Sequence, residues 1–582
     1  METRRLHQVW RGHAQADAPP KRRCGPGRLR ILVLPATVAL IASAATPASV
    51  GAATAILTVS SDTTLTADQN GGIVIAADNV ILDGGGYTLH YDGSSCTGVT
   101  VSGRTGVTIR NLTVVGFTCG GGFLLGGSSA TPTTGNTLTD DTASGNGAGF
   151  VLDRATGNTL VGNHADHNSA NGFQIKTGSS GNTISANVAN GNGDSGIRIS
   201  ESNHVVVTDN TTASNVDFGI VLDDSSDGLV VGNTLSANNV GIQVDSGSTA
   251  NRVVGNTSTG GILGFCVVTA SANTFTDNTA TGAKNADGNG GGFALFFSAT
   301  DNTFERNVTT GNDFGFIINN ASNRNTFRQN TALGNSRFGF SLCSGTANTF
   351  VKNTATDNDF GFAINNASSH NTFRQNTASA NSRFGFSLYV GSTQNQLIDN
   401  QANGNGQFGF ALQAGSKANE LRGNQACRSG IVDLKESADS APNVYADNTF
   451  CTTDRVTTLP KATPVTSGSW TATLSGAGIS GTASLVVPAT GWATAAFSLS
   501  RLKKGVSVSA RIVAGAVCDA SATTVVRLPG YTTTIGGTWY QRWVFDGAAL
   551  DRLRSAIGSD TPLWFDASVG GDRACTRLAP VT

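Results

Sequence analysis

Charged residues of types used in acid–base and metal chemistry recur along the middle of the chain, about one sequence repeat apart. Lys176 and Arg198 are candidate catalytic residues, since either can act as a base or hold an anionic substrate. An enzyme that cleaves uronate polymers needs such a base together with a group that neutralises the substrate carboxylate. Calcium prefers hard oxygen ligands, and four nearby carboxylates could hold it as a metal site: Asp223, Asp224, Asp227 and Asp245.

Strand alternation defines a second set of candidates, which would bind a substrate through hydrogen bonds. If Phe150 and Leu152 point into a core, Val151 and Asp153 must point outward. The same alternation in later segments brings further side chains to that outer face. The candidate substrate-binding residues are Asp153, Gln174, Gln243, Asn319, Asn365 and Tyr389. The alternative interpretation is a solvated face with incidental charges.

An internal repeat must position these residues. One copy begins at Asn302 and ends at Phe316, with Asn302, Asn307 and Asn312 at spacing five. The middle Asn, or an Asp in its place, recurs every 22 to 24 residues, with one step of 29: Asp141, Asn163, Asn187, Asn210, Asn233, Asn256, Asn278, Asn307, Asn330, Asn353, Asn376, Asn400, Asn424 and Asn448. A fixed period of this length indicates a solenoid.

The composition of the unit indicates strands rather than helices. Apolar residues recur at spacing two and are interrupted by Asn and Gly, as in short strands separated by turns. Asn tolerates left-handed backbone at turns, and stacked coils about 4.8 Å apart would align the Asn side chains in ladders. Two rows of Phe should fill the core, one containing Phe304 and Phe327 and the other Phe293 and Phe316.

Two early segments carry a resemblance to a known family. Residues 79–89 (NVILDGGGYTL) and 106–114 (GVTIRNLTV) resemble the openings of right-handed β-helix repeat proteins. This group includes pectate lyases, mannuronan epimerases and the periplasmic accessory protein of nitrous-oxide reductase. The resemblance implies an all-β fold, a right-handed single-stranded parallel β-helix (solenoid). The motifs of its enzymes are absent, among them Asp-Pro-His of the epimerases and Trp-Ile-Asp-His of the pectate lyases.

The sequence divides into four segments. Residues 1–53 read as a signal peptide with an upstream segment, because an Arg-rich flank precedes an apolar run and small residues. We expect the β-helix over 54–454 and a linker over 455–465. The Asn repeat then stops and Trp becomes frequent, which predicts a small all-β, β-sandwich-like domain over 466–582.

Cysteine positions agree with stacked coils and with export. Cys96 and Cys119, like Cys427 and Cys451, lie about one coil apart, which places their Cα atoms within disulfide range. Cys518 and Cys575 fall together in the C-terminal domain. We therefore predict the disulfides Cys96–Cys119, Cys427–Cys451 and Cys518–Cys575.

Composition narrows the functional hypotheses. The net charge of −1 provides no electrostatic footprint for nucleic acid. We expect a secreted, extracellular monomer, without a transmembrane segment after signal removal, that binds polysaccharide or cell-surface glycan and needs no cofactor, with calcium as a possible ligand. Two alternatives stay open: a polysaccharide lyase or hydrolase acting on uronate-containing polymers, and a structural or adhesive surface rod.

Overall fold

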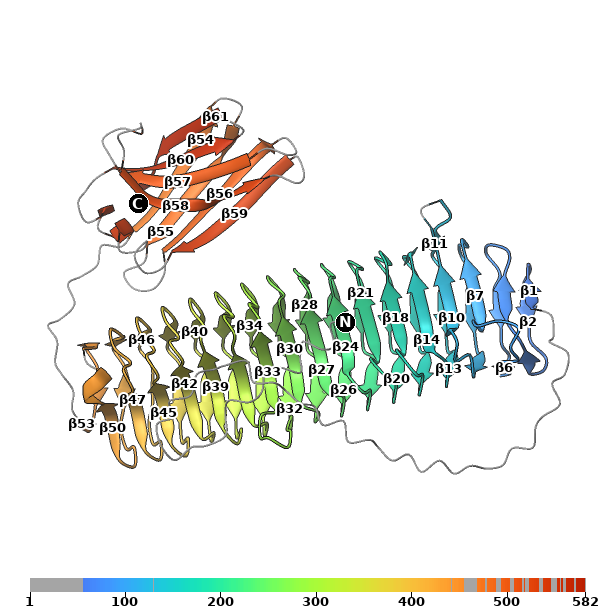
Figure 1. Cartoon of the computed structure of the whole chain (residues 1–582), viewed down its shortest axis with the longest axis horizontal. Coiled ribbons are helices and arrows are strands. Elements are labelled where there is room, and N and C mark those ends of the chain that lie inside the picture. Colours follow the sequence, from blue (N-terminus) through green and yellow to red (C-terminus); the bar gives the residue numbers. More distant parts are fainter. Residues whose placement is uncertain are drawn as a thin grey trace. The chain divides into compact units, whose positions relative to one another are not determined.

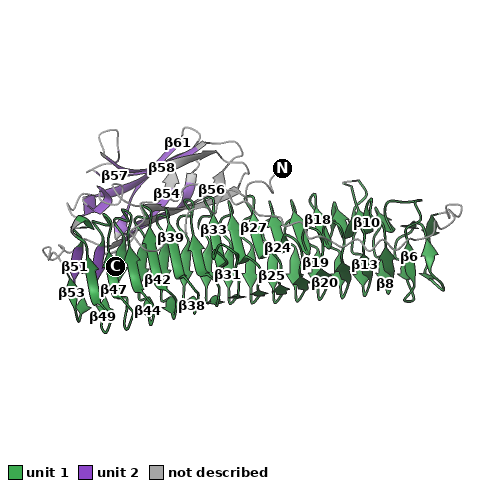
Figure 2. Cartoon of the chain, turned by 60° about the horizontal axis from the view of Figure 1, so that its bottom comes forward, with its two compact units in different colours: residues 1–419, 423–443, 447–457 green, residues 420–422, 444–446, 458–582 purple. Residues whose placement is uncertain are grey.

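The computed structural model describes residues 56–454, apart from 129 and 441, and most of 468–580. In the latter range the gaps are 477–478, 488–492, 503–506, 515–517, 519–522, 533–536, 546–551, 555, 558–561 and 570–571. The predicted signal peptide and the linker lie outside the described residues. The chain forms two compact units (Figure 2), of which the second comprises 458–582 with the short segments Glu420–Arg422 and Val444–Ala446.

The first unit is a parallel β-solenoid (Figure 1). Each regular coil contributes one strand to each of three sheets, here named A, B and C. A representative coil consists of β36 (Phe314–Ile318) in sheet A, β37 (Thr326–Arg328) in sheet B and β38 (Thr331–Leu333) in sheet C. Each strand pairs in parallel with its equivalent in the next coil, as β36 does with β39 (Phe338–Cys343). The predicted all-β solenoid is thus confirmed.

Sheet A has eighteen strands within the described residues. They are β1 (Leu57–Val59), β4 (Ile73–Ile75), β7 (Val99–Ser102), β10 (Gly121–Gly126), β14 (Ala148–Asp153), β18 (Phe173–Lys176), β21 (Ile197–Ser200), β24 (Phe218–Asp223), β27 (Val240–Asp245), β30 (Leu263–Val268), β33 (Gly291–Phe296), β36, β39, β42 (Phe360–Asn365), β45 (Phe384–Leu388), β47 (Phe408–Leu412), β50 (Val432–Glu436) and β53 (Thr453–Asp454).

Buried Asn ladders connect the coils, as the repeat predicts. The Asn330 side chain donates from Nδ2 to the Phe304 carbonyl oxygen at 2.9 Å and to Asn353 Oδ1 at 3.0 Å. Its Oδ1 accepts from the backbone and side-chain nitrogens of Asn307. Each Asn therefore satisfies polar groups of the preceding and following coils, in an interior where an unpaired polar group is costly.

The turns differ from the expectation in one respect. The left-handed residue is not the middle Asn but the residue before it: φ is 53° at Arg306, 54° at Gln329 and 56° at Lys352. The physical reason is that the Asn is committed to the buried ladder, so its neighbour reverses the chain with an outward side chain.

The two predicted Phe rows fill the core. Phe304 stacks on Phe327 and Phe316 on Phe340, with ring centroids 5.0 and 4.6 Å apart. The two rows meet edge to face, as Phe316 and Phe327 do at 6.0 Å. All four rings are buried. Stacked rings along the axis favour a single register, because a slip by one residue would turn the row outward.

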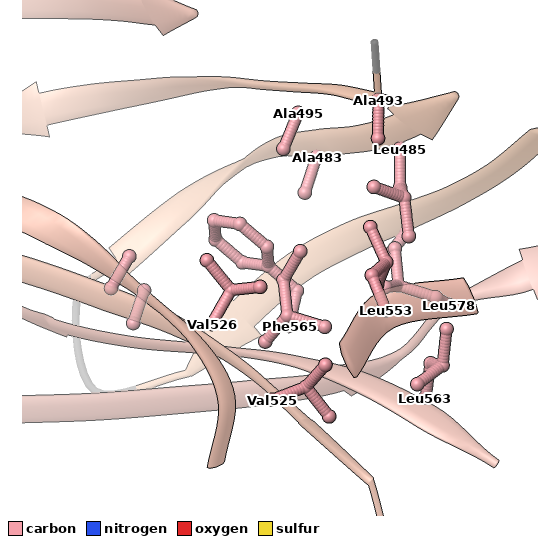
Figure 3. Close-up of a cluster of buried hydrophobic side chains, with 14 of the residues drawn as sticks. Ala483, Leu485, Ala493, Ala495, Val525, Val526, Leu553, Leu563, Phe565 and Leu578 are labelled. Atoms are coloured by element: carbon pink, nitrogen blue, oxygen red, sulfur yellow. The ribbon is translucent and has the colours of Figure 1, made fainter. Parts of the chain in front are cut away.

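The second unit contains two antiparallel sheets. One has the order β59 (Gly537–Phe545), β56 (Ala493–Leu502), β55 (Ile479–Val487), β54 (Gly468–Gly476), β62 (Ala579–Pro580), and the other the order β58 (Thr523–Thr532), β57 (Ser507–Ala514), β60 (Leu563–Val569), β61 (Asp572–Arg577). Leu485, Val526, Leu553 and Phe565 belong to its buried apolar cluster (Figure 3). This arrangement agrees with the predicted all-β domain.

The three predicted cysteine pairs are bridged in the structure. The Cα atoms lie 5.2 Å apart in Cys96–Cys119, 5.0 Å in Cys427–Cys451 and 6.5 Å in Cys518–Cys575. The first two bridges join adjacent coils of the solenoid. Among the helices of the described residues, none has the length and apolar character needed to cross a bilayer.

Candidate functional site

The outer face of sheet A carries the candidate residues in two straight rows. The registers of β14 through β27 stack Gln174, Arg198, Val221 and Gln243 in one row. The second row pairs Asp153 with Lys176, Ser200 with Asp223, and Asp223 with Asp245. Inward residues such as Phe150 and Leu152 are buried in the core between them. The strand registers agree with the rows inferred from alternation, although Val221 and Gln243 of the first row are buried.

Both candidate catalytic residues form ion pairs within these rows. Lys176 Nζ lies 3.7 Å from Asp153 Oδ2, and Arg198 Nη2 lies 2.5 Å from Asp223 Oδ2. Arg154 also approaches Asp153 at 3.3 Å. These carboxylates hold both basic side chains in position. Held in this way, the two side chains can contact hydroxyl or anionic groups of a ligand.

Gln243 and Asp245 form a second polar pair at the end of these rows. Gln243 Nε2 donates to Asp245 Oδ2 at 2.9 Å, and Asp245 Oδ1 accepts from the Ser246 backbone nitrogen at 2.7 Å. Burial, followed by the nearby charge of Asp223, raises the pKa of Asp245. Gln243 is buried, and its Oε1 has no hydrogen-bond partner. Gln243 Oε1 is therefore a buried acceptor that the described residues leave unsatisfied.

The four carboxylates expected to hold calcium do not converge. Asp223 and Asp245 stack on adjacent strands, with Asp223 paired to Arg198. Asp224 and Asp227 are exposed residues of the following turn, at φ 48° and 55°. The physical reason is that this turn leaves the strand after Asp223, so the later carboxylates leave the row. Among the described residues, one group of three potential metal ligands has its ligand atoms within 4.8 Å of one another, and it consists of Cys518, Asp566 and Cys575.

The later candidates occupy the same second row, further along the solenoid. Asn365 donates from Nδ2 to Tyr389 Oη at 3.3 Å, and burial raises the pKa of Tyr389. Asn319 accepts from the Asn320 backbone nitrogen at 2.8 Å, so its carbonyl group is used within its own turn. Asn365 and Tyr389 are thus brought together by the structure, whereas Asn319 serves partly to shape a turn.

Sequence reasoning missed a third Phe row, on the outer side of sheet A. Phe314 stacks on Phe338 at 5.0 Å, Phe338 on Phe360 and Phe360 on Phe384 at 4.8 Å. These are the first Phe residues of the Phe-Gly-Phe segments, which simple alternation would turn inward. The intervening Gly faces inward instead: a Cβ at Gly339 would meet Ala355 and Asn358. The Gly between the two Phe residues could have revealed this row in the sequence, because only a residue without a Cβ fits the inward position.

The repeat, the three parallel sheets and the buried ladders define the class of the protein as a parallel β-helix. A family model described as "Right handed beta helix region" matches residues 260–426, and a model described as "Periplasmic copper-binding protein (NosD)" matches residues 57–250. The chain belongs to the right-handed β-helix repeat proteins.

Three of the solved structures with similarity to the chain are the following. The DFA-IIIase of Arthrobacter chlorophenolicus A6 has 12% identity and a TM-score of 0.34, with 49% of this chain and 85% of that chain covered. The A-module of the Azotobacter vinelandii mannuronan C-5 epimerase AlgE6 has 12% identity and a TM-score of 0.34, covering 66% and 92%. The tailspike of E. coli bacteriophage HK620 has 10% identity and a TM-score of 0.36, covering 88% and 87%. Scores this low support no inference about activity, and no curated protein sequence matches the chain.

The described residues do not gather a set of ligands that fits a copper site, although one matching model carries that description. Copper ligands are typically Met, His or Cys, and the one Met of the sequence is Met1. The Cys518 and Cys575 sulfurs are joined in a disulfide, and Asp566 is paired with Arg511 and Arg573. Cys518, Cys575 and Asp566 are therefore already bonded to partners within the protein and are not free to bind a metal.

Proposed function

We propose that this protein binds a polysaccharide along the outer face of sheet A, from β14 to β27. The observation that carries the proposal is the pair of adjacent outward rows, in which carboxylates, amides and cations repeat at the strand spacing. Sugar hydroxyls both donate and accept hydrogen bonds, and planar polar side chains complement them. The mutual pairs of Lys176 with Asp153 and of Arg198 with Asp223 hold the groups in position before a ligand arrives. Such preorganisation lowers the entropic cost of binding.

A linear ligand suits this face because the rows are straight. Successive coils place their outward side chains about 4.8 Å apart along the axis, so a chain of sugar units can contact several coils in succession. Asn365 and Tyr389 extend the second row toward later coils. The proposal requires neither bond cleavage nor calcium.

The proposed place of action is outside the cytosol, as a secreted protein. Three disulfides support this, since such bonds form and persist in oxidising compartments. We further propose that the protein acts as a monomer, because each coil buries its apolar edge against its neighbours within one chain.

A double substitution tests the binding face. We expect Gln174→Ala with Lys176→Ala to weaken binding at least about tenfold, because each lost hydrogen bond to a charged or polar partner is worth about 1 kcal/mol or more. The removal of Lys176 leaves Asp153 next to Arg154, so no carboxylate is stranded. Affinity electrophoresis of the full chain through gels containing pectate, alginate or a neutral glucan measures the retardation.

Arg324→Ala supplies the matched control. Arg324 pairs with Asp301 at 2.8 Å on another part of the solenoid surface, and exposed pairs contribute less than about 1 kcal/mol. Equal retardation of the double variant and this control would contradict the proposed face. Absorbance of unsaturated products, recorded in the same mixtures, tests the lyase alternative, and we expect none to form.

A further inference from the structure

A polar hollow lies on a different face of the solenoid, where sheet C ends. Its volume is about 350 Å³, and it is lined by Gln375, Thr377, Asp399, Gln401, Gly423 and Gln425. These residues come from three successive coils. Thr377 bridges Gln401, and Gln401 bridges Gln425, so the lining residues stack in register.

The hollow coincides with a departure from the repeat. The residue after the middle Asn is Thr in many coils, for example Thr331, Thr354 and Thr377, whose β-branched side chains suit a strand. After Asn400 and Asn424 it is Gln in two adjacent coils. The regular ladder of sheet C also ends at β44 (Thr377–Ser379), and Gln401 continues it only through isolated bridges. When a residue departs from the repeat and gains no packing by doing so, a functional role is expected for it.

Backbone conformation opens the space. Gln375, Asp399 and Gly423 precede the ladder Asn residues of their coils and have φ of 55°, 53° and 65°. A Cβ at Gly423 would lie 2.4 Å from Asp399 Oδ1. Glycine at this position therefore leaves room beside the Asp399 carboxylate that any other residue would fill.

The polar side chains around the hollow are not used by the protein. Within the described residues, no side-chain hydrogen bond or ion pair involves Gln375, Asp399, Gln401 or Gln425, and all four are exposed. At the equivalent turn position of other coils, charged side chains pair when the neighbouring coil supplies the opposite charge. Arg306 pairs with Asp277 in this way. The hollow thus presents free donors and acceptors from three coils at one place.

The chemistry of the lining selects the ligand. Three amides and a hydroxyl offer donors and acceptors in nearly equal number, and Asp399 adds a carboxylate with two acceptor oxygens. No basic residue is present to bind a phosphate or sulfate, and one carboxylate is fewer than calcium sites commonly use. We propose that this hollow binds a neutral sugar residue of a polysaccharide. The inference shares its ligand class with the proposed function but concerns a separate face, so the two can fail independently.

Restoring the repeat tests the inference. The double variant Gln401→Thr, Gln425→Thr replaces both amides with the residue that the repeat uses at this position, so the fold should be retained. We expect its retardation by neutral glucan and galactomannan gels to fall about tenfold relative to the parent, while its thermal midpoint stays the same or rises. Gln329→Ala, an exposed residue of the same turn row two coils away, should leave retardation unchanged.

The other arms separate the alternatives. If only the sheet A double variant loses binding to neutral glycans, the hollow is not a sugar site and the proposed function stands. If only the Gln401→Thr, Gln425→Thr variant loses it, the hollow is supported and the sheet A face is not. Calorimetric titration with calcium chloride alone that shows binding abolished by Asp399→Asn would overturn the sugar assignment. Absence of retardation of the parent chain in every gel would reject both proposals.

Discussion

Asp141→Asn should raise the free energy of unfolding by about 2–3 kcal/mol at pH 7.5. Asp141 occupies the middle Asn ladder and is fully buried. Its Oδ1 accepts from the Leu112 backbone nitrogen at 2.9 Å, but its Oδ2 has no partner. At the equivalent atom of the next coil, Asn163 Nδ2 donates to the Leu138 carbonyl oxygen and to Asn187 Oδ1. An amide at 141 can make both donations at any pH, whereas the carboxyl group must take up a proton before it can donate at all.

The stability gain of Asp141→Asn should increase with pH, because the carboxyl group of the parent is buried. Burial, above all, raises the pKa of Asp141 well above its ordinary value, and the charges of Asp140 and Asp83 add to this. In the unfolded chain the carboxyl ionises near pH 4. Between that value and the folded pKa, folding takes up a proton, so the parent loses up to about 1.4 kcal/mol of stability per pH unit as pH rises. Below pH 4 both states are protonated and the advantage of the Asn variant should be smallest.

Urea denaturation of both proteins at pH 4.5 and pH 7.5 measures this difference. Asp209→Asn is the matched control, since Asp209 is the equivalent exposed turn residue of another coil and its φ of 55° suits Asn. We expect the control to shift the unfolding midpoint little at either pH. A gain for Asp141→Asn that is equal at both pH values would show that Asp141 does not bind a proton on folding.

Asn330→Ala should lower the free energy of unfolding by about 3–6 kcal/mol. The substitution removes the acceptor of the Asn307 backbone and side-chain nitrogens and the donor to the Phe304 carbonyl oxygen. All of this lies in the buried interior, where each unsatisfied group costs about 1–3 kcal/mol. Because coils are stabilised by their neighbours, the loss should spread to adjacent coils, which hydrogen exchange of the flanking strands can follow.

Two companion variants make the ladder prediction specific. Arg328→Ala removes an exposed side chain of the adjoining strand β37 and should change stability by less than about 0.5 kcal/mol. Asn330→Asp keeps the shape of the side chain but recreates the arrangement found at Asp141, so its penalty should be larger at pH 7.5 than at pH 4.5. A penalty for Asn330→Ala as small as that of Arg328→Ala would mean that the ladder adds little to stability.

Strand alternation predicts from the sequence which residues of the candidate site point outward, but not which of them pair. The outward rows from Asp153 to Asp245 follow from strand periodicity, and the registers agree. Alternation did not predict the ion pairs of Lys176 and Arg198, because pairing depends on rotamers and on neighbours in the next coil. The sequence also suggested Asp224 and Asp227 as calcium ligands beside Asp223, although the turn after Asp223 carries both residues away from the row.

The sequence by itself determined the solenoid, because a repeat of Asn and Phe at constant spacing satisfies its polar groups and buries its rings only when coils stack in register. The same argument covers the coil-to-coil disulfides, whose separation in sequence equals one turn. Only the tertiary structure decided which polar groups remain free. Among the described residues, Asp141 Oδ2 and the glutamine side chains around Asp399 lack hydrogen-bond partners. The reason is shared, since each environment is assembled from three coils and no single coil contains it.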